Sequence, residues 1–191
     1  GRYADALASA TCTDCGVGTY LNSFGNDDAS DCRACQIGRY SNLTGANRCT
    51  DCGAGTYVAT VGSDQEADCI GCVAGRFSAS TGSSSPSVCA ECGAGTYANA
   101  AGSTTCISCP AGRYVAMPAS DTMLDCIACE AGKYLATLGN DAAEDCIDCV
   151  AGRFASVPGS VVCASCVAGQ FASVNTSSSC IECLAGKYSE A

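Results

Sequence analysis

The cysteines of this 191-residue chain constrain its fold more than any other feature. All 20 cysteines fall in Cys-x-x-Cys pairs, and successive pairs begin either 20 or 17 residues apart. A short fixed period is the signature of a tandem array in which each repeat is one small supersecondary unit. The ten pairs begin at Cys12, Cys32, Cys49, Cys69, Cys89, Cys106, Cys126, Cys146, Cys163 and Cys180.

Large apolar residues are scarce in the chain. Leu, Ile, Val and Phe together number 29, about 15% of the residues, against the roughly 20% below which a chain lacks the means to form a packed core. Cysteine above roughly 8–10% predicts covalent crosslinks instead. The sequence therefore predicts that disulfides stabilise the fold in place of a hydrophobic core.

A Gly-x-aromatic triplet begins three residues after the second cysteine of each pair. Eleven of the twelve aromatic residues occupy this slot, and Phe24 is the exception. The glycine suits a positive φ or a close approach to a neighbouring repeat. The ring is expected to stack on the adjacent disulfide and repeat, which would make a thin continuous core. The slot residues are Tyr3, Tyr20, Tyr40, Tyr57, Phe77, Tyr97, Tyr114, Tyr134, Phe154, Phe171 and Tyr188.

The local pattern favours strands and turns. Runs such as 55–59 predict strands of three to five residues, and Gly, Ser, Asn and Asp clusters predict turns between them. We expect a small disulfide-rich fold, an elongated solenoid or rod of ten short β-hairpin or loop repeats over 1–191, with little or no helix. Each repeat should touch only its neighbours. Both ends of the sequence fall inside the repeat pattern, which favours a segment of a longer or polymerised chain.

One segment identifies a resemblance. Cys109-Pro110-Ala111-Gly112-Arg113-Tyr114 closely resembles the ephrin-receptor-like cysteine-rich repeat, a relative of the tumour-necrosis-factor-receptor module. Most copies in this chain replace the proline but keep the ring and cysteine slots. The resemblance implies repeats that are extracellular, disulfide-bonded and non-enzymatic.

Two disulfide schemes fit the pairs. In a ladder, the second cysteine of one pair joins the first of the next, every loop is equivalent, and Cys12 and Cys183 have no partner in this segment. In an interleaved scheme Cys12 joins Cys32 and Cys15 joins Cys35. We favour the ladder, which also matches the single-loop submodule of the resembling family. Its cysteines are Cys15, Cys32, Cys35, Cys49, Cys52, Cys69, Cys72, Cys89, Cys92, Cys106, Cys109, Cys126, Cys129, Cys146, Cys149, Cys163, Cys166 and Cys180.

Metal binding offers two further alternatives. The pair spacing is also that of a zinc ribbon, but a complete absence of histidine favours a crosslinking framework. Acidic loops such as 64–68 could bind calcium, although each offers only two or three carboxylates where calcium takes six to eight oxygens. We therefore expect no cofactor, with calcium as a lesser alternative.

Charge and motifs exclude several function classes. A net charge of −10 without a basic run argues against nucleic-acid binding. No apolar stretch approaches the ~20 residues of a membrane span. Without histidine there is no Ser-His-Asp or Cys-His arrangement, and no G-x-x-x-x-G-K loop is present. We expect no enzymatic activity and no catalytic residue.

The remaining interpretation is structural. We expect a building block of an extracellular fibre or cell-surface coat that assembles with itself, head to tail or laterally. Sequons at Asn42 and Asn175 predict N-linked glycans. The alternatives are a receptor-type module that binds a protein or glycan ligand, and a zinc-binding scaffold.

Overall fold

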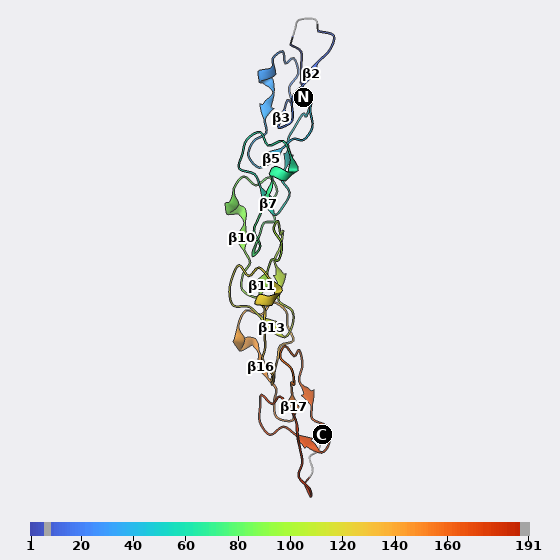
Figure 1. Ribbon diagram of the computed structural model, residues 1–191, viewed down its shortest axis with the longest axis vertical. Coiled ribbons are helices and arrows are strands. Elements are labelled where there is room, and N and C mark those ends of the chain that lie inside the picture. The colour runs from blue at the N-terminus through green and yellow to red at the C-terminus, as the bar shows by residue number, and fades with distance from the viewer. Residues whose placement is uncertain (6–8, 188–191) are drawn as a thin grey trace. The chain divides into compact units, whose positions relative to one another are not determined.

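Ten short antiparallel hairpins account for all the strands of the computed structural model, which describes residues 1–5 and 9–187 (Figure 1). The first strand of each hairpin comes from the last two residues of a Gly-x-aromatic triplet. The second strand is the two residues between the cysteines of the next pair. The hairpins are β1 (Arg2–Tyr3) with β2 (Thr13–Asp14), β3 (Thr19–Tyr20) with β4 (Arg33–Ala34), β5 (Arg39–Tyr40) with β6 (Thr50–Asp51), β7 (Thr56–Tyr57) with β8 (Ile70–Gly71), β9 (Arg76–Phe77) with β10 (Ala90–Glu91), β11 (Thr96–Tyr97) with β12 (Ile107–Ser108), β13 (Arg113–Tyr114) with β14 (Ile127–Ala128), β15 (Lys133–Tyr134) with β16 (Ile147–Asp148), β17 (Arg153–Phe154) with β18 (Ala164–Ser165), and β19 (Gln170–Phe171) with β20 (Ile181–Glu182).

Nine loops connect consecutive cysteine pairs. Each loop begins at the second cysteine of one pair and ends at the first cysteine of the next. We number them in chain order as 15–32, 35–49, 52–69, 72–89, 92–106, 109–126, 129–146, 149–163 and 166–180. Short hairpins, nine disulfides and very little helix confirm the predicted small disulfide-rich fold. The predicted strand length of three to five residues is wrong, because every strand in the described residues has two residues.

The only helices in the described part of the chain are five 3-10 turns, one in each of the longer loops. They are η1 (Ala29–Asp31), η2 (Glu66–Asp68), η3 (Pro86–Val88), η4 (Met123–Asp125) and η5 (Ala143–Asp145). Among the described residues, none of these helices is long or apolar enough to cross a membrane.

The chain divides into two units, which we describe separately. Unit 1 comprises Gly1–Ala90 and Ala100–Thr105, and unit 2 comprises Glu91–Asn99 and Cys106–Ala191. Within unit 1, η1 (blue) and η3 (green), three loops apart, lie on the same side in Figure 1, and η2 (teal) lies on the other. Within this unit, two long loops that are three positions apart therefore lie on the same side.

Consecutive loops within each unit are joined by a recurring set of three backbone hydrogen bonds. Between loops 5 and 6, Gly95 donates to Val115 at 2.7 Å, Ala98 donates to Ser120 at 3.1 Å, and Ala119 donates back to Cys92 at 2.8 Å. The same three bonds join loops 1 and 2, 2 and 3, 3 and 4, 6 and 7, 7 and 8, and 8 and 9. Each loop therefore satisfies backbone groups of its neighbour that would otherwise be unpaired.

The triplet glycines also reach the second loop along, so the expectation that each repeat touches only its neighbours is wrong. In unit 1, Gly38 has a φ of 87°, and a Cβ added there would collide with the carbonyl oxygen of Gly82, two loops away. In unit 2, Gly112 stands in the same relation to Gly159. Positive φ at the triplet glycine is confirmed, and its reason is this approach of two backbones.

Candidate functional site

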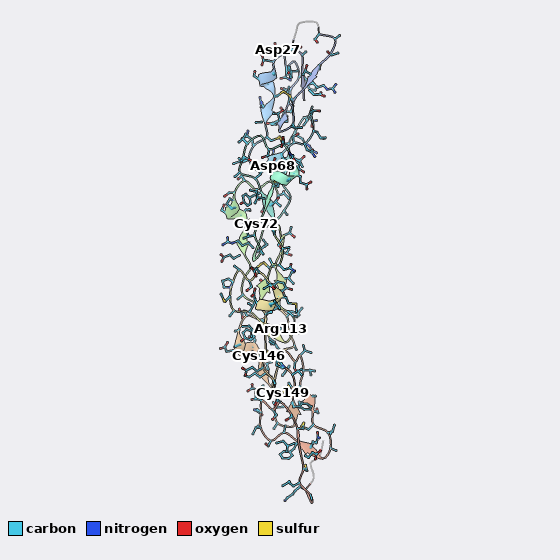
Figure 2. All side chains as sticks on the ribbon, viewed as in Figure 1. Asp27, Asp68, Cys72, Arg113, Cys146 and Cys149 are labelled. Carbon is cyan, nitrogen blue, oxygen red and sulfur yellow. A yellow bond between two sulfur atoms is a disulfide. The ribbon has the colours of Figure 1, made fainter. Side chains whose placement is uncertain are left out.

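The nine disulfides are the most distinctive chemical feature of the structure. Each joins the second cysteine of one pair to the first cysteine of the next, as the ladder scheme has it, with Cα–Cα distances of 5.5–5.8 Å that suit a disulfide. The bridges are Cys15–Cys32, Cys35–Cys49, Cys52–Cys69, Cys72–Cys89, Cys92–Cys106, Cys109–Cys126, Cys129–Cys146, Cys149–Cys163 and Cys166–Cys180. Figure 2 shows Cys146 and Cys149, which belong to consecutive bridges.

The two remaining cysteines are unbridged. Cys12 is exposed and Cys183 is partly exposed. Among the described residues, no group of three or more His, Cys, Asp or Glu side chains is arranged to hold a metal ion. Cysteines joined in disulfides carry no thiolate for zinc, so these bridges and the four-cysteine zinc alternative exclude one another.

The core of each repeat lies between one ring and the next disulfide. Tyr97 packs with Val115 and with the bridge of Cys109 and Cys126. One loop further on, the Tyr114 ring packs against the next cluster of the same kind. The predicted stacking of rings on the adjacent disulfide is confirmed in these repeats. Tyr188, the last slot aromatic, lies outside the described residues.

The residue after each ring is a core position that our sequence reasoning missed. Leu21 and Val58 in unit 1, and Val115 and Leu135 in unit 2, are each at most 3% exposed, whereas most slot rings are only half-buried. A signal was present, because this position holds only Leu, Val, Ala or Ser in every repeat. Its small, mostly apolar side chain fills the space between the ring and the disulfide.

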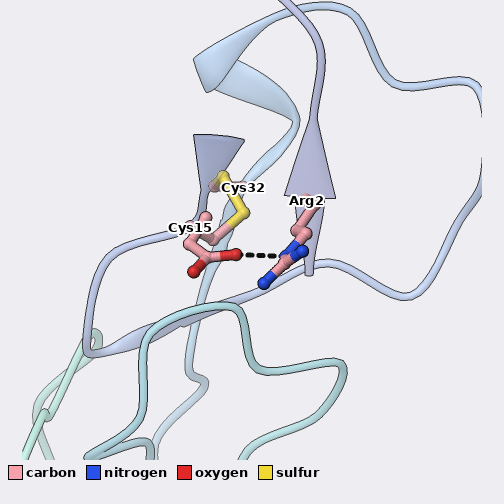
Figure 3. Close-up of polar contacts among 4 residues, drawn as sticks. Arg2, Cys15 and Cys32 are labelled. Atoms are coloured by element: carbon pink, nitrogen blue, oxygen red, sulfur yellow. Dashed lines mark hydrogen bonds and ion pairs between the residues drawn. A yellow bond between two sulfur atoms is a disulfide. The ribbon is translucent and has the colours of Figure 1, made fainter. Parts of the chain in front are cut away.

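In three repeats, a basic residue between glycine and ring pairs with an aspartate on the second strand of its own hairpin. Lys133 contacts Asp148 at 3.0 Å, and Arg39 contacts Asp51 at 2.6 Å. Arg2 makes the equivalent contact with Asp14 at 2.5 Å. The dashed line at Arg2 in Figure 3 marks it, beside the disulfide of Cys15 and Cys32. Because all three pairs are partly exposed, each contributes little to stability.

Two arginines bond instead to a cysteine carbonyl. The Nη1 of Arg113, labelled in Figure 2, donates to the carbonyl of Cys126 at 2.8 Å. Arg76 makes the same contact with Cys89 at 3.1 Å. Several of the basic side chains between glycine and ring are therefore engaged within their own hairpins.

The acidic residues before the cysteines have a structural role in the turns. In loop 3, one carboxylate oxygen of Asp68 accepts hydrogen bonds from the backbone N–H groups of Asp64 and Gln65, at 3.0 and 3.1 Å. Asp31, Asp125 and Asp145 cap their turns in the same way. Sequence reasoning missed this use of the carboxylates, and calcium binding by these loops stays a prediction.

Both sequon asparagines lie in exposed loops. Asn42 is followed by Leu43, which is also exposed. In unit 2, the Oδ1 of Asn175 accepts a hydrogen bond from the backbone N–H of Ala151 at 3.1 Å. This contact leaves the Nδ2 of Asn175, the atom to which an N-linked glycan attaches, outside the bond.

These features define a class of protein, a tandem array of small disulfide-closed hairpin loops. The family model described as tyrosine-protein kinase ephrin type A/B receptor-like matches residues 24–69, 38–89 and 82–126, which together cover just over half of the chain. The chain therefore belongs to the ephrin-receptor-like family of cysteine-rich repeats, a disulfide-rich module without catalytic function. None of the curated proteins compared with the chain matches it.

Proposed function

We propose that this chain is an extracellular structural protein, a building block of a fibre or cell-surface coat that assembles with copies of itself. The observation that carries the proposal is the recurrence of the same three hydrogen bonds between consecutive loops within each unit. An array built this way grows by adding equivalent loops without enlarging a core. That property suits a long structural element.

The disulfides support the extracellular part of the proposal. Nine bridges in one chain are typical of oxidising compartments, because cytosolic thiols are kept reduced. Closing loops of this length stabilises the fold by roughly 3 kcal/mol per bridge in the chain-entropy model. Membership of a disulfide-rich repeat family points the same way.

Electron microscopy of the oxidised chain, secreted from a eukaryotic host, tests the assembly. We expect concentration-dependent fibres or ordered sheets, and a matching rise in sedimentation coefficient. A chain that stays monomeric across the concentration range in both measurements contradicts self-assembly. Material treated with a reductant is the control, because it should lose both the loops and any assembly.

We also propose that Asn42 and Asn175 carry N-linked glycans. Both lie in exposed loops where a glycan is accommodated without disturbing the disulfides. Intact mass spectrometry of the secreted chain should show mass above the bare 19.0 kDa, removed by peptide N-glycosidase. The variants Asn42→Gln and Asn175→Gln should each lose one glycan. A secreted wild-type chain of unmodified mass contradicts the proposal.

A further inference from the structure

Loop 6 (109–126) contains an apolar groove. Met117, Leu124 and Ile127 line it and are 73%, 87% and 54% exposed. Val115, which belongs to the buried core, also lines it. The groove is formed by the two arms of loop 6 and by Ile127 just after it, so it lies wholly within unit 2.

Two of these apolar side chains, Met117 and Leu124, are peculiar to this loop, whereas Ile127 has exposed counterparts in Ile70 and Ile147. In five loops the two cysteines have the same sequence separation of 17, so the positions of these loops can be compared directly. Where loop 6 has Met117, the others have Ser23, Thr60, Ser80 and Thr137. Where it has Leu124, they have Ser30, Ala67, Ser87 and Glu144. Both methionines of the chain lie in loop 6, at Met117 and Met123.

The turn does not need these side chains. In loop 7, the Oγ1 of Thr137 donates to the Oδ1 of Asn140 at 2.9 Å, and loop 3 has an equivalent hydroxyl contact of 3.0 Å. Met117 has no hydroxyl, so loop 6 keeps only the other contact of this turn, in which the Oγ of Ser120 donates to the Met117 carbonyl. Loops 7 and 3 make that contact as well, from Asn140 to Thr137 and from Ser63 to Thr60. Loop 6 thus lacks the hydrogen bond that the hydroxyl of this residue makes in loops 3 and 7, and it exposes a thioether in its place. A flexible, polarisable side chain of this kind is typical of binding surfaces.

The backbone turn and the disulfide that form the groove are nevertheless the same as in other long loops. One carboxylate oxygen of Asp125 accepts from the backbone N–H groups of Asp121 and Thr122, both at 3.1 Å, as the matching aspartates do in other long loops. The disulfide closes both arms. The apolar side chains therefore project from a preorganised loop, which lowers the entropic cost of binding.

Charge indicates the kind of partner. Asp121 and Asp125 line the groove, and the Arg113 guanidinium is directed to the carbonyl of Cys126. The chain has a net charge of −10 and engages several of its cations within its own hairpins. For this groove, a second copy is therefore a poor electrostatic match, whereas a basic segment is a good one.

We propose that the loop 6 groove binds a segment of another protein in which an apolar side chain lies next to lysine or arginine. The apolar side chain contacts Met117 and Leu124, and the cation lies near Asp121. This binding goes beyond the structural role proposed above and does not depend on it.

The two methionines give a direct test. Labelling the oxidised full chain with [¹³C-methyl]methionine yields two methyl signals, both from loop 6. The probe is the peptide Ser-Lys-Leu-Phe-Lys-Ser. A second peptide replaces both lysines with glutamate, and a third replaces leucine and phenylalanine with serine. We expect saturable shifts of both methyl signals with the first peptide, and affinities lower by about tenfold or more with the other two.

Loop 7 supplies the variants and the control. Met117→Thr and Leu124→Glu place in loop 6 the residues that loop 7 has at the same positions. Each variant should weaken binding of the first peptide by about tenfold or more. In Met117→Thr, the methyl group of Met123 remains as the probe. Leu138→Ser alters an exposed leucine of loop 7 and should leave binding unchanged. Disulfide mapping of each variant verifies the loops.

Several outcomes would overturn the proposal. They are the absence of shifts with the first peptide, equal shifts with the third, and unchanged binding by both loop 6 variants. Methyl shifts that depend on protein concentration without peptide would replace the proposed partner with a second copy of the chain. Shifts on adding neutral lipid vesicles but not peptide would replace it with a membrane surface.

Discussion

The backbone N–H of Ala119 donates a 2.8 Å hydrogen bond to the carbonyl of Cys92, and Ala119 holds a φ of 57° to do so. In most loops a glycine makes this bond with the same positive φ, as Gly139 does in the next loop. The contact between loops therefore fixes the backbone conformation even where the residue is unsuited to it. The only other non-glycine residue with positive φ in the described part of the chain, Thr176, makes the equivalent bond to Cys149.

Ala119→Gly should stabilise the protein by up to about 1 kcal/mol. The left-handed conformation costs a non-glycine residue roughly 1–2 kcal/mol, which exceeds the roughly 0.5–1 kcal/mol by which glycine's backbone entropy opposes folding. Hydrogen exchange of the amides in 109–126 measures the change. Ala116→Gly is the matched control, because Ala116 has no positive φ, and that variant should be destabilised. Changes of the same sign in both variants would contradict the explanation.

The triplet glycines allow backbone strain to be separated from collision. Gly112→Ala should have both effects, because Gly112 has a φ of 84° and the added Cβ would collide with the Gly159 carbonyl. Gly152 has a φ of 82° with open space around it, and Gly93 has open space and no positive φ. The cost should fall in the order Gly112→Ala, Gly152→Ala, Gly93→Ala, with about 1–2 kcal/mol for the φ alone. Equal costs for the first two would show that the contact with the second loop along is unimportant.

The residue after the ring should matter about as much as the ring itself. Tyr97→Ala and Val115→Ala each create a cavity against the bridge of Cys109 and Cys126. Buried aromatic deletions typically cost about 3–5 kcal/mol. We expect less for Tyr97→Ala, because the disulfides persist, and a similar loss for Val115→Ala. Val157→Ala is the control, since Val157 is 60% exposed. Thermal unfolding under oxidising conditions measures all three, and an unchanged Val115→Ala would contradict the model of the core.

The pKa of Asp28 should lie below the usual range for aspartate. The backbone N–H of Ser30 donates to its carboxylate at 2.7 Å and favours the charged form. Because this pKa is lowered on folding, the bond's contribution is present above the ordinary aspartate pKa and is lost as the pH falls through the lowered one. A ¹³C NMR titration of the Asp28 carboxyl measures it, and a value at or above the ordinary one would contradict the bond.

Peptide mapping without reduction should recover Cys35–Cys49 and Cys92–Cys106 as linked fragments. Each of these bridges closes one loop that contains one triplet. Samples alkylated before digestion control for disulfide exchange. Recovery of Cys12 linked to Cys32 would favour the interleaved scheme, and reduced cysteines with stoichiometric zinc would exclude both.

Much of the hairpin could be predicted from sequence because its determinants are local. The triplet and the next cysteine pair determine where the strands form. The ring is needed to pack on a disulfide, and the glycine is needed for a positive φ. The contact of Gly38 with Gly82 could not be predicted in this way. It depends on the rotation between consecutive loops, which no single repeat encodes.

The turns and the groove show a similar limit. In sequence, Asp68 is a candidate calcium ligand. Its acceptance of two backbone N–H bonds could not be predicted, because it depends on the path of the 3-10 turn. The alignment of loops by length makes Met117 and Leu124 stand out in sequence, but only their exposure shows that the core does not use them.

The disulfide ladder also has a mechanical consequence. When the chain is pulled from its two ends, tension passes from Cys15 directly to Cys32 through sulfur, and then through two residues to the next bridge at Cys35. The residues inside each loop lie outside this shortest covalent path. An extended chain spans about 3.3–3.6 Å per residue. While the bridges are intact, the residues inside each loop do not contribute this length when the chain is stretched. Stretching the oxidised protein should lengthen it far less than its residue count implies, and a reductant should release that hidden length one bridge at a time.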